Sequence, residues 1–64
     1  MIAKEPWMQK GAEVIARHLN GTITNVTESN YLGQNIVHSI YVQLENTQKP
    51  VPFNPEDVKE KVAA

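Results

Sequence analysis

The 64-residue sequence predicts a mainly β protein: a small antiparallel barrel of four or five short strands with a short C-terminal helix. Three observations predict it. Residues 35–46 alternate between apolar and polar side chains with the two-residue period of a half-buried strand. Asn20-Gly21 is the strongest two-residue turn signal in the chain. Asn54-Pro55 supplies an N-cap and a first helical residue for the closing helix.

The strand predicted over residues 35–46 organises the rest of the chain. Its alternation assigns one set of side chains to the core and the next set to the outside. The predicted inner face consists of Ile36, His38, Ile40, Val42 and Leu44. The predicted outer face consists of Val37, Ser39, Tyr41, Gln43 and Glu45.

The segment before this strand predicts two more strands. Residues 12–19 fit a helical or an extended pattern, and the Val14-Ile15 pair between flanking glycines favours a strand. After a turn at Asn20-Gly21, residues 22–28 form the second strand. Ile23 and Val26 are three positions apart, so a bulge or bend near Thr24-Asn25 is expected to bring both to one face.

The remaining segments follow in order. Residues 29–34 are expected to form a loop, and residues 45–49 a second turn. The prolines of residues 50–53 restrict that segment to a short edge strand, with Phe53 directed at the core. A helix is predicted from about Pro55 to Ala63, with acids in its first turn and an apolar stripe of Val58 and Val62.

The predicted domain organisation is an N-terminal arm over residues 1–10 and one barrel domain over residues 11–64. Trp7 and Met8 are the large apolar residues of the arm. They either fold back over an open end of the core or leave Trp7 exposed as an anchor for a partner. A chain of this size has a marginal core, so self-association is a reasonable supplement to its stability.

The composition excludes several classes of protein. The net charge is −1, and the basic residues are scattered rather than clustered as a strong phosphate-binding surface requires. No cysteine is present, so disulfides and thiolate metal sites are excluded. The sequence has neither an apolar run long enough to span a membrane nor a signal-peptide pattern, which predicts a cytoplasmic protein. The sequons at Asn20 and Asn25 are then chance matches.

The order of strands resembles that of small SH3-like barrels, particularly KOW-type modules and the PsaE family of photosystem I. The matching residues are Gly11 to Val14, Gly21-Thr22-Ile23, Tyr41 to Leu44 and Phe53 to Val58. The resemblance covers roughly Gly11 to Val58 and implies a fold rather than an activity. The chain departs from nucleic-acid-binding KOW modules in its thin basic and glycine content. It also lacks the aromatic groove with which signalling SH3 domains bind proline-rich peptides.

No residue pattern points to catalysis or to a cofactor. His38 in an apolar row could be a ligand or a general base, but a hydrogen-bonded histidine at a barrel rim or in a cross-strand pair explains it more simply. His18 could pair with His38, although two histidines without a third ligand make a weak zinc site. No Ser-His-acid order, P-loop or HExxH motif occurs.

These observations favour a non-catalytic module that binds protein, either a second copy of itself or a larger assembly. The alternative is a KOW-like module that binds RNA or DNA, with Tyr41 and Arg17 as a stacking platform. A remote alternative is an enzyme whose site forms on oligomerisation, lined by His38, Tyr41 and Gln43. The candidate interaction surface comprises Trp7, Arg17, His18, Tyr31, His38 and Tyr41. The sequence identifies neither the partner nor the oligomeric state.

Overall fold

The computed structural model describes residues 2–61, which form one curled antiparallel sheet. The elements in chain order are β1 (Ile2–Ala3), β2 (Glu13–Ala16), β3 (Leu19–Tyr31), β4 (Gln34–Leu44), β5 (Val51–Phe53), a 3₁₀ turn η1 (Pro55–Asp57) and β6 (Val58–Glu60). The strand order is β1-β4-β3-β2-β6, and β5 pairs with β4 beside β1. Every strand pair is antiparallel. The mainly β prediction is therefore confirmed.

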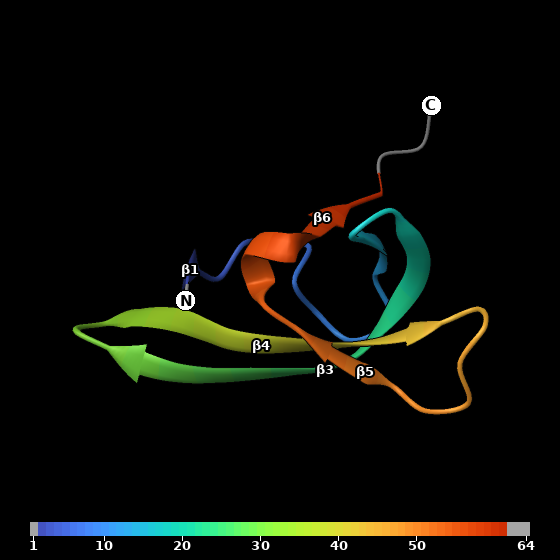
Figure 1. The fold of residues 1–64 in the computed structure, drawn as a ribbon. Coiled ribbons are helices and arrows are strands. Elements are labelled where there is room, and N and C mark those ends of the chain that lie inside the picture. Colours follow the sequence, from blue (N-terminus) through green and yellow to red (C-terminus); the bar gives the residue numbers. More distant parts are fainter. Residues whose placement is uncertain (1, 62–64) are drawn as a thin grey trace.

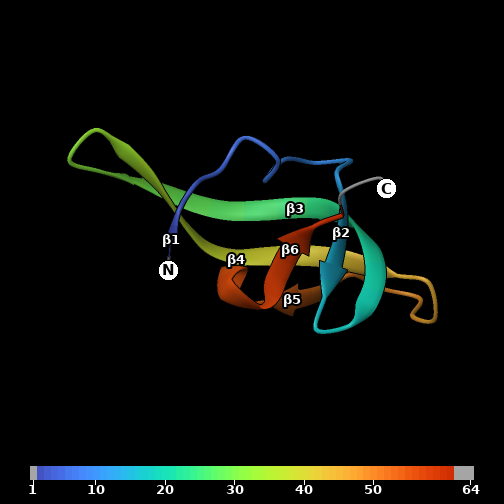
Figure 2. The same ribbon diagram turned by 90° about the horizontal axis from the view of Figure 1, so that it is seen from above.

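The long β3 and β4 form the axis of the molecule (Figure 1). At one end they curl with β2, β5 and β6 around the core, and at the other they run on as a hairpin beyond the body. The overall dimensions of 38 × 28 × 18 Å reflect this projection. Figure 2, seen from above, shows the same hairpin extending past β1.

The first tight turn lies at Arg17-His18, so the prediction of a turn at Asn20-Gly21 is wrong. Both turn residues have positive φ, 51° and 87°, and Ala16 pairs directly with Leu19. Gly21 instead lies inside β3, opposite Leu44. A Cβ atom there would lie 2.8 Å from the carbonyl oxygen of Gln43 and would overlap the Val42 side chain. The glycine permits close packing of two strands rather than a reversal of the chain.

Two bulges interrupt the pairing of β3 with β4. One lies at Thr24 on β3, because Ile23 pairs with Val42 while Asn25 pairs with Tyr41. This bulge confirms the irregularity predicted near Thr24-Asn25 and brings Val26 against the core.

The second bulge was not predicted, and it reverses part of the predicted face assignment of β4. Thr27 pairs with Ser39 and Glu28 pairs with Val37, which leaves His38 as the extra residue. Val37 is consequently buried and His38 is exposed, the opposite of the prediction. Ile36 likewise lies on the outer face with His38 rather than in the core. Beyond the bulge, Ile40, Val42 and Leu44 are buried as predicted.

The region predicted as a loop over residues 29–34 is the end of a hairpin. β3 continues to Tyr31, β4 begins at Gln34, and Leu32-Gly33 makes the two-residue turn between them. Leu32 has a φ of 52° and Gly33 a φ of 82°. These values suit a type I′ turn, whose twist matches that of the flanking strands.

The core lies inside the curl of the sheet. Every fully buried residue in the described part of the chain is apolar, so the core contains no buried charge there. The buried apolar side chains are Met8, Val14, Ala16, Ile23, Val37, Ile40, Val42, Leu44 and Val58. Phe53, predicted to point at the core from the edge strand, packs against this cluster together with Val51.

The predicted C-terminal helix is absent from the described residues. Pro55–Asp57 makes one 3₁₀ turn, and the side chain of Asn54 makes no capping hydrogen bond. The chain then enters β6, where Val58 is buried opposite Ala16 of β2. A β-branched residue and an open edge of β2 favour a strand over a short isolated helix. The last part of the predicted helix, residues 62–63, lies outside the described residues.

The N-terminal arm folds back onto the core, which is the first of the two arrangements considered for Trp7 and Met8. Met8 is 0% exposed, and its backbone N–H donates to the carbonyl oxygen of Glu5 at 2.9 Å. Trp7 is half-buried against the same cluster. The arm thus supplies part of the core of this small fold.

Candidate functional site

Beyond the His38 bulge, β3 and β4 form a hairpin that projects from the body of the molecule (Figure 1). Tyr31 pairs with Gln34 next to the turn, and Ser29 pairs with Ile36 one step further back. Paired residues in an antiparallel ladder place their side chains on the same face. Tyr31, Ser29 and Ile36 therefore share the outer face of the hairpin, away from buried Val37.

The outer face gathers exposed apolar surface. Ser29, Tyr31, Ile36 and His38 line a shallow, mainly apolar hollow. Tyr31 is 66% exposed and Leu32, in the turn, is 86% exposed. Among the described residues, the only other exposed large apolar side chain is Leu19, at 44%. We call the five residues Ser29, Tyr31, Leu32, Ile36 and His38 the hairpin surface.

A hydrogen bond fixes the geometry of the hollow. The Oγ atom of Ser29 lies 2.7 Å from Nε2 of His38, across the two strands. The bulge makes this contact possible, because it turns the His38 side chain onto the outer face beside Ser29. A hydroxyl next to an imidazole is the first half of a nucleophile–base pair, but such a pair needs a third group that orients the base. The geometry of residues 2–61 gives His38 a structural partner in Ser29 and supplies no such triad.

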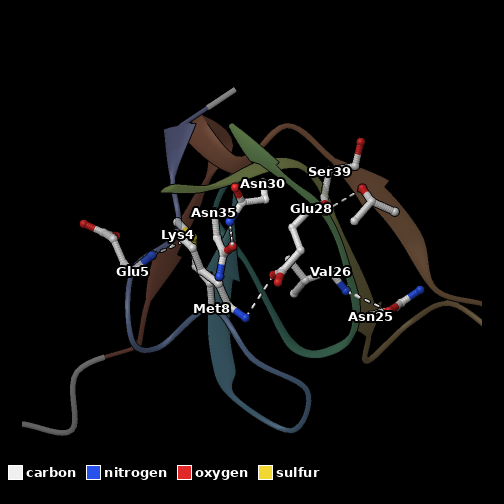
Figure 3. Close-up of polar contacts among 10 residues, drawn as sticks. Lys4, Glu5, Met8, Asn25, Val26, Glu28, Asn30, Asn35 and Ser39 are labelled. Carbon is white, nitrogen blue, oxygen red and sulfur yellow. Dashed lines mark hydrogen bonds and ion pairs between the residues drawn. The ribbon is translucent and has the colours of Figure 1, made fainter. Parts of the chain in front are cut away.

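The inner face of the hairpin is attached to the N-terminal arm. Nζ of Lys4 lies 2.9 Å from Oε2 of Glu28, and the Lys4 backbone N–H donates to the carbonyl oxygen of Asn35 at 2.9 Å (Figure 3). The side-chain amide of Asn30 also donates to Oδ1 of Asn35, at 3.4 Å. The pairing of β1 with β4 through Ile2 continues this attachment. These contacts set the angle at which the hairpin leaves the body.

The structure brings two of the six predicted surface residues together. Tyr31 and His38 line the hollow. Trp7 is half-buried, and its Nε1 donates to Oε2 of Glu5 at 2.7 Å. Tyr41 is half-buried on the outer face of β4, between its pairing partners on β3 and β5.

Arg17 and His18, also among the predicted surface residues, form the turn between β2 and β3. The guanidinium of Arg17 donates from Nε and Nη2 to Oδ2 of Asp57, at 3.2 and 3.1 Å. Its backbone N–H also donates to the carbonyl oxygen of Asp57. These bonds attach the turn to η1, so Arg17 has a structural partner. His18 and His38 lie on different elements, and in the described chain no group of three potential ligands is placed to hold a metal ion.

Sequence reasoning missed Ser29, Leu32 and Ile36. The first two were assigned to a loop, and Ile36 was assigned to the core. The signal that could have identified the hairpin is Leu32-Gly33 flanked by polar and apolar residues on both sides, because a glycine can occupy the second position of a type I′ turn. The bulge at His38 has no comparable local signal.

The fold and this surface define the chain as a small all-β protein with a curled antiparallel sheet and a projecting hairpin. No protein-family model, curated protein or solved structure matches the chain. In the part of the chain that the structure describes, no helix has the length and apolar character needed to cross a membrane.

Proposed function

We propose that this chain is a non-catalytic protein-binding module of the SH3-like barrel class, and that the hairpin surface makes the contact. The curled sheet of short antiparallel strands supports the fold class. The observation that carries the function is the concentration of exposed apolar side chains on a hairpin that projects from the body. A monomeric domain ordinarily buries such groups or scatters them, and an exposed cluster is typical of a contact site.

The chemistry of the hairpin favours a protein over a nucleic acid. Residues 27–38 contain no Lys or Arg, and their one charged residue, Glu28, is paired with Lys4. Phosphate binding requires cations near the contact surface. Tyr31 offers a stacking surface, but Ile36 and Leu32 beside it suit apolar side chains of a protein better than bases.

The proposal can be tested by placing a photo-crosslinking amino acid at Leu32 in the full chain, in the cells that express it. Leu19 is the matched control, because it is also an exposed leucine next to a two-residue turn, at the opposite end of β3. We expect a discrete protein adduct from position 32, which Tyr31→Ser abolishes, and no such adduct from position 19.

A second measurement uses purified components. Tyr31→Ser combined with Leu32→Ser is expected to weaken binding of the adduct partner by at least about tenfold, as loss of an aromatic anchor commonly does. Leu19→Ser should leave the affinity unchanged. Equal adducts from both positions would contradict the proposal, as would salt-dependent binding of RNA or DNA that the double variant leaves intact.

A further inference from the structure

One edge of β3 is open along the projecting hairpin. β3 pairs with β4 up to Tyr31, but it pairs with β2 only as far as Thr22. Ile23 is held from the same side by backbone hydrogen bonds with Gly11 and Ala12. From residue 24 to residue 31, no described segment forms a backbone hydrogen bond with this edge.

The backbone groups that face the open edge follow from the turn. Tyr31 and Gln34 close a two-residue hairpin, so Tyr31 and Ser29 direct their N–H and C=O groups toward β4. Glu28 and Asn30 therefore direct theirs away from β4. The N–H of Val26 is already satisfied by Oδ1 of Asn25 at 2.9 Å. The unpaired stretch is thus short and centred on Ser29.

This edge lacks the usual protection against strand pairing. Exposed edges normally carry lysine, proline or inward-pointing charge. β3 contains no Lys and no Pro, and Glu28 is its one charged residue, paired with Lys4. Its irregularity, the bulge at Thr24, lies before the open stretch rather than within it.

We propose that the open edge of β3 pairs antiparallel with the β3 edge of a second copy of this chain, across a twofold axis at Ser29. The proposal rests on the proposed function and names its partner. Glu28 of one copy then lies opposite Asn30 of the other, and the two pairs form four backbone hydrogen bonds. Ser29 lies opposite Ser29 in a pair without hydrogen bonds.

Other registers are less favourable. Residues directly opposite each other must share a face of the sheet, so the axis must pass through a residue. An axis at Glu28 places two carboxylates opposite each other, which is destabilising. An axis at Asn30 places Glu28 opposite Leu32, which is in the turn and has a φ of 52°. The axis at Ser29 instead joins a carboxylate to an amide twice.

The pairing also supplies what the projecting hairpin lacks. A two-stranded ribbon is marginally stable in water, and β1 adds only Ile2–Ala3 as a third strand. A dimer converts the ribbon into a four-stranded sheet at its centre. On the outer face, Tyr31 of one copy lies over Thr27 of the other, a favourable aromatic–β-branched pair. The two hairpin surfaces then form one continuous apolar area.

The first test is sedimentation equilibrium of the full chain over a range of concentrations. Asn30→Pro removes an N–H that points to the open edge and leaves the β4 ladder intact, whereas Asn30→Ala keeps that N–H. We expect a reversible wild-type dimer whose dissociation constant rises at least about tenfold in Asn30→Pro, because two hydrogen bonds are lost per dimer, and much less in Asn30→Ala. Circular dichroism confirms that both variants are folded. Equal weakening by both variants would overturn the proposed backbone pairing.

The second test fixes the register by disulfide formation. The chain has no cysteine, and opposite residues in a pair without hydrogen bonds have Cα atoms close enough for a disulfide. Ser29→Cys is expected to form a covalent dimer under mild oxidation, and Asn30→Cys to remain largely monomeric. A wild-type chain that stays monomeric at its highest soluble concentration, with no crosslink in Ser29→Cys, refutes the homodimer. If a Tyr31-dependent adduct with a different protein is still found, the proposed function stands without it.

Discussion

The side chains of Ser29 and His38 meet across β3 and β4 at 2.7 Å, at the bulge where β4 exchanges its faces. Val37 before the bulge and Ile40 after it are both buried, although three positions separate them. One extra residue between them accounts for this arrangement. His38 therefore serves as an inserted residue that orients the hairpin, rather than as part of the core.

Deletion of His38 is expected to preserve the fold. Without this residue, Val37 and Ile40 are two positions apart, and regular alternation buries both while the pairs of Thr27 and Glu28 are retained. The loss of the Ser29 contact should cost about 1 kcal/mol. Urea unfolding followed by circular dichroism measures the difference.

Deletion of Tyr41 is the matched control, and it should unfold the chain. It would place Ile40 next to Val42, so that the apolar residues on one side of the deletion are forced to the outer face. Each displaced core residue costs about 1.5–3 kcal/mol, which exceeds the stability expected of so small a domain within a few residues. Loss of cooperative unfolding in the His38 deletion would show that the bulge is essential to the fold.

The strands of the curled sheet could be predicted from the sequence because each depends on local alternation. Ile40, Val42 and Leu44 follow the two-residue period, and they are buried as predicted. The irregularity at Thr24 was also predictable, since Ile23 and Val26 are spaced three apart. In each case the chain's own spacing carries the information.

The errors come from features decided by tertiary contacts. The same Asn20-Gly21 pair that forms turns elsewhere lies within a strand, because Gly21 is the residue that fits against Val42. The acids and proline near Pro55 suit a helix start, but the unpaired edge of β2 favours a strand for Val58. The outer face of the hairpin depends on the bulge at His38, so no local pattern could identify it.

Gly21→Ala is expected to destabilise the fold far more than Gly33→Ala. An added methyl group at Gly21 meets the Gln43 carbonyl oxygen at 2.8 Å and overlaps the Val42 side chain, so the strands must separate. We expect a cost of about 1–3 kcal/mol or more, as in overpacked cores. At Gly33 the space is open, and the cost of about 1 kcal/mol comes from its φ of 82°. Comparison of urea midpoints decides the order, and a larger effect at Gly33 would contradict the packing argument.

Val58→Ala separates a C-terminal strand from a C-terminal helix. Alanine is the better helix former, so a helical terminus would tolerate the change. In the structure, Val58 is buried opposite Ala16, and truncation should lower the free energy of unfolding by about 1–3 kcal/mol. Lys59→Ala is the control, because Lys59 is exposed and should change stability by less than about 0.5 kcal/mol. Increased helical ellipticity in Val58→Ala would contradict the assignment of β6.

Met8→Ala tests whether the N-terminal arm is part of the folded domain. Met8 is fully buried among strand residues, and its Sδ accepts a hydrogen bond from the Glu5 backbone N–H at 3.4 Å. Removal of this side chain leaves a cavity, so we expect a loss of about 2–5 kcal/mol, whereas Met8→Leu conserves the volume and should cost less than about 1.5 kcal/mol. Gln9→Ala, at the exposed neighbouring position, controls for effects on the arm itself. If Met8→Ala unfolds at the same urea concentration as Gln9→Ala, the arm does not contribute to the core. The attachment of the hairpin through Lys4 would then be too weak to set its direction.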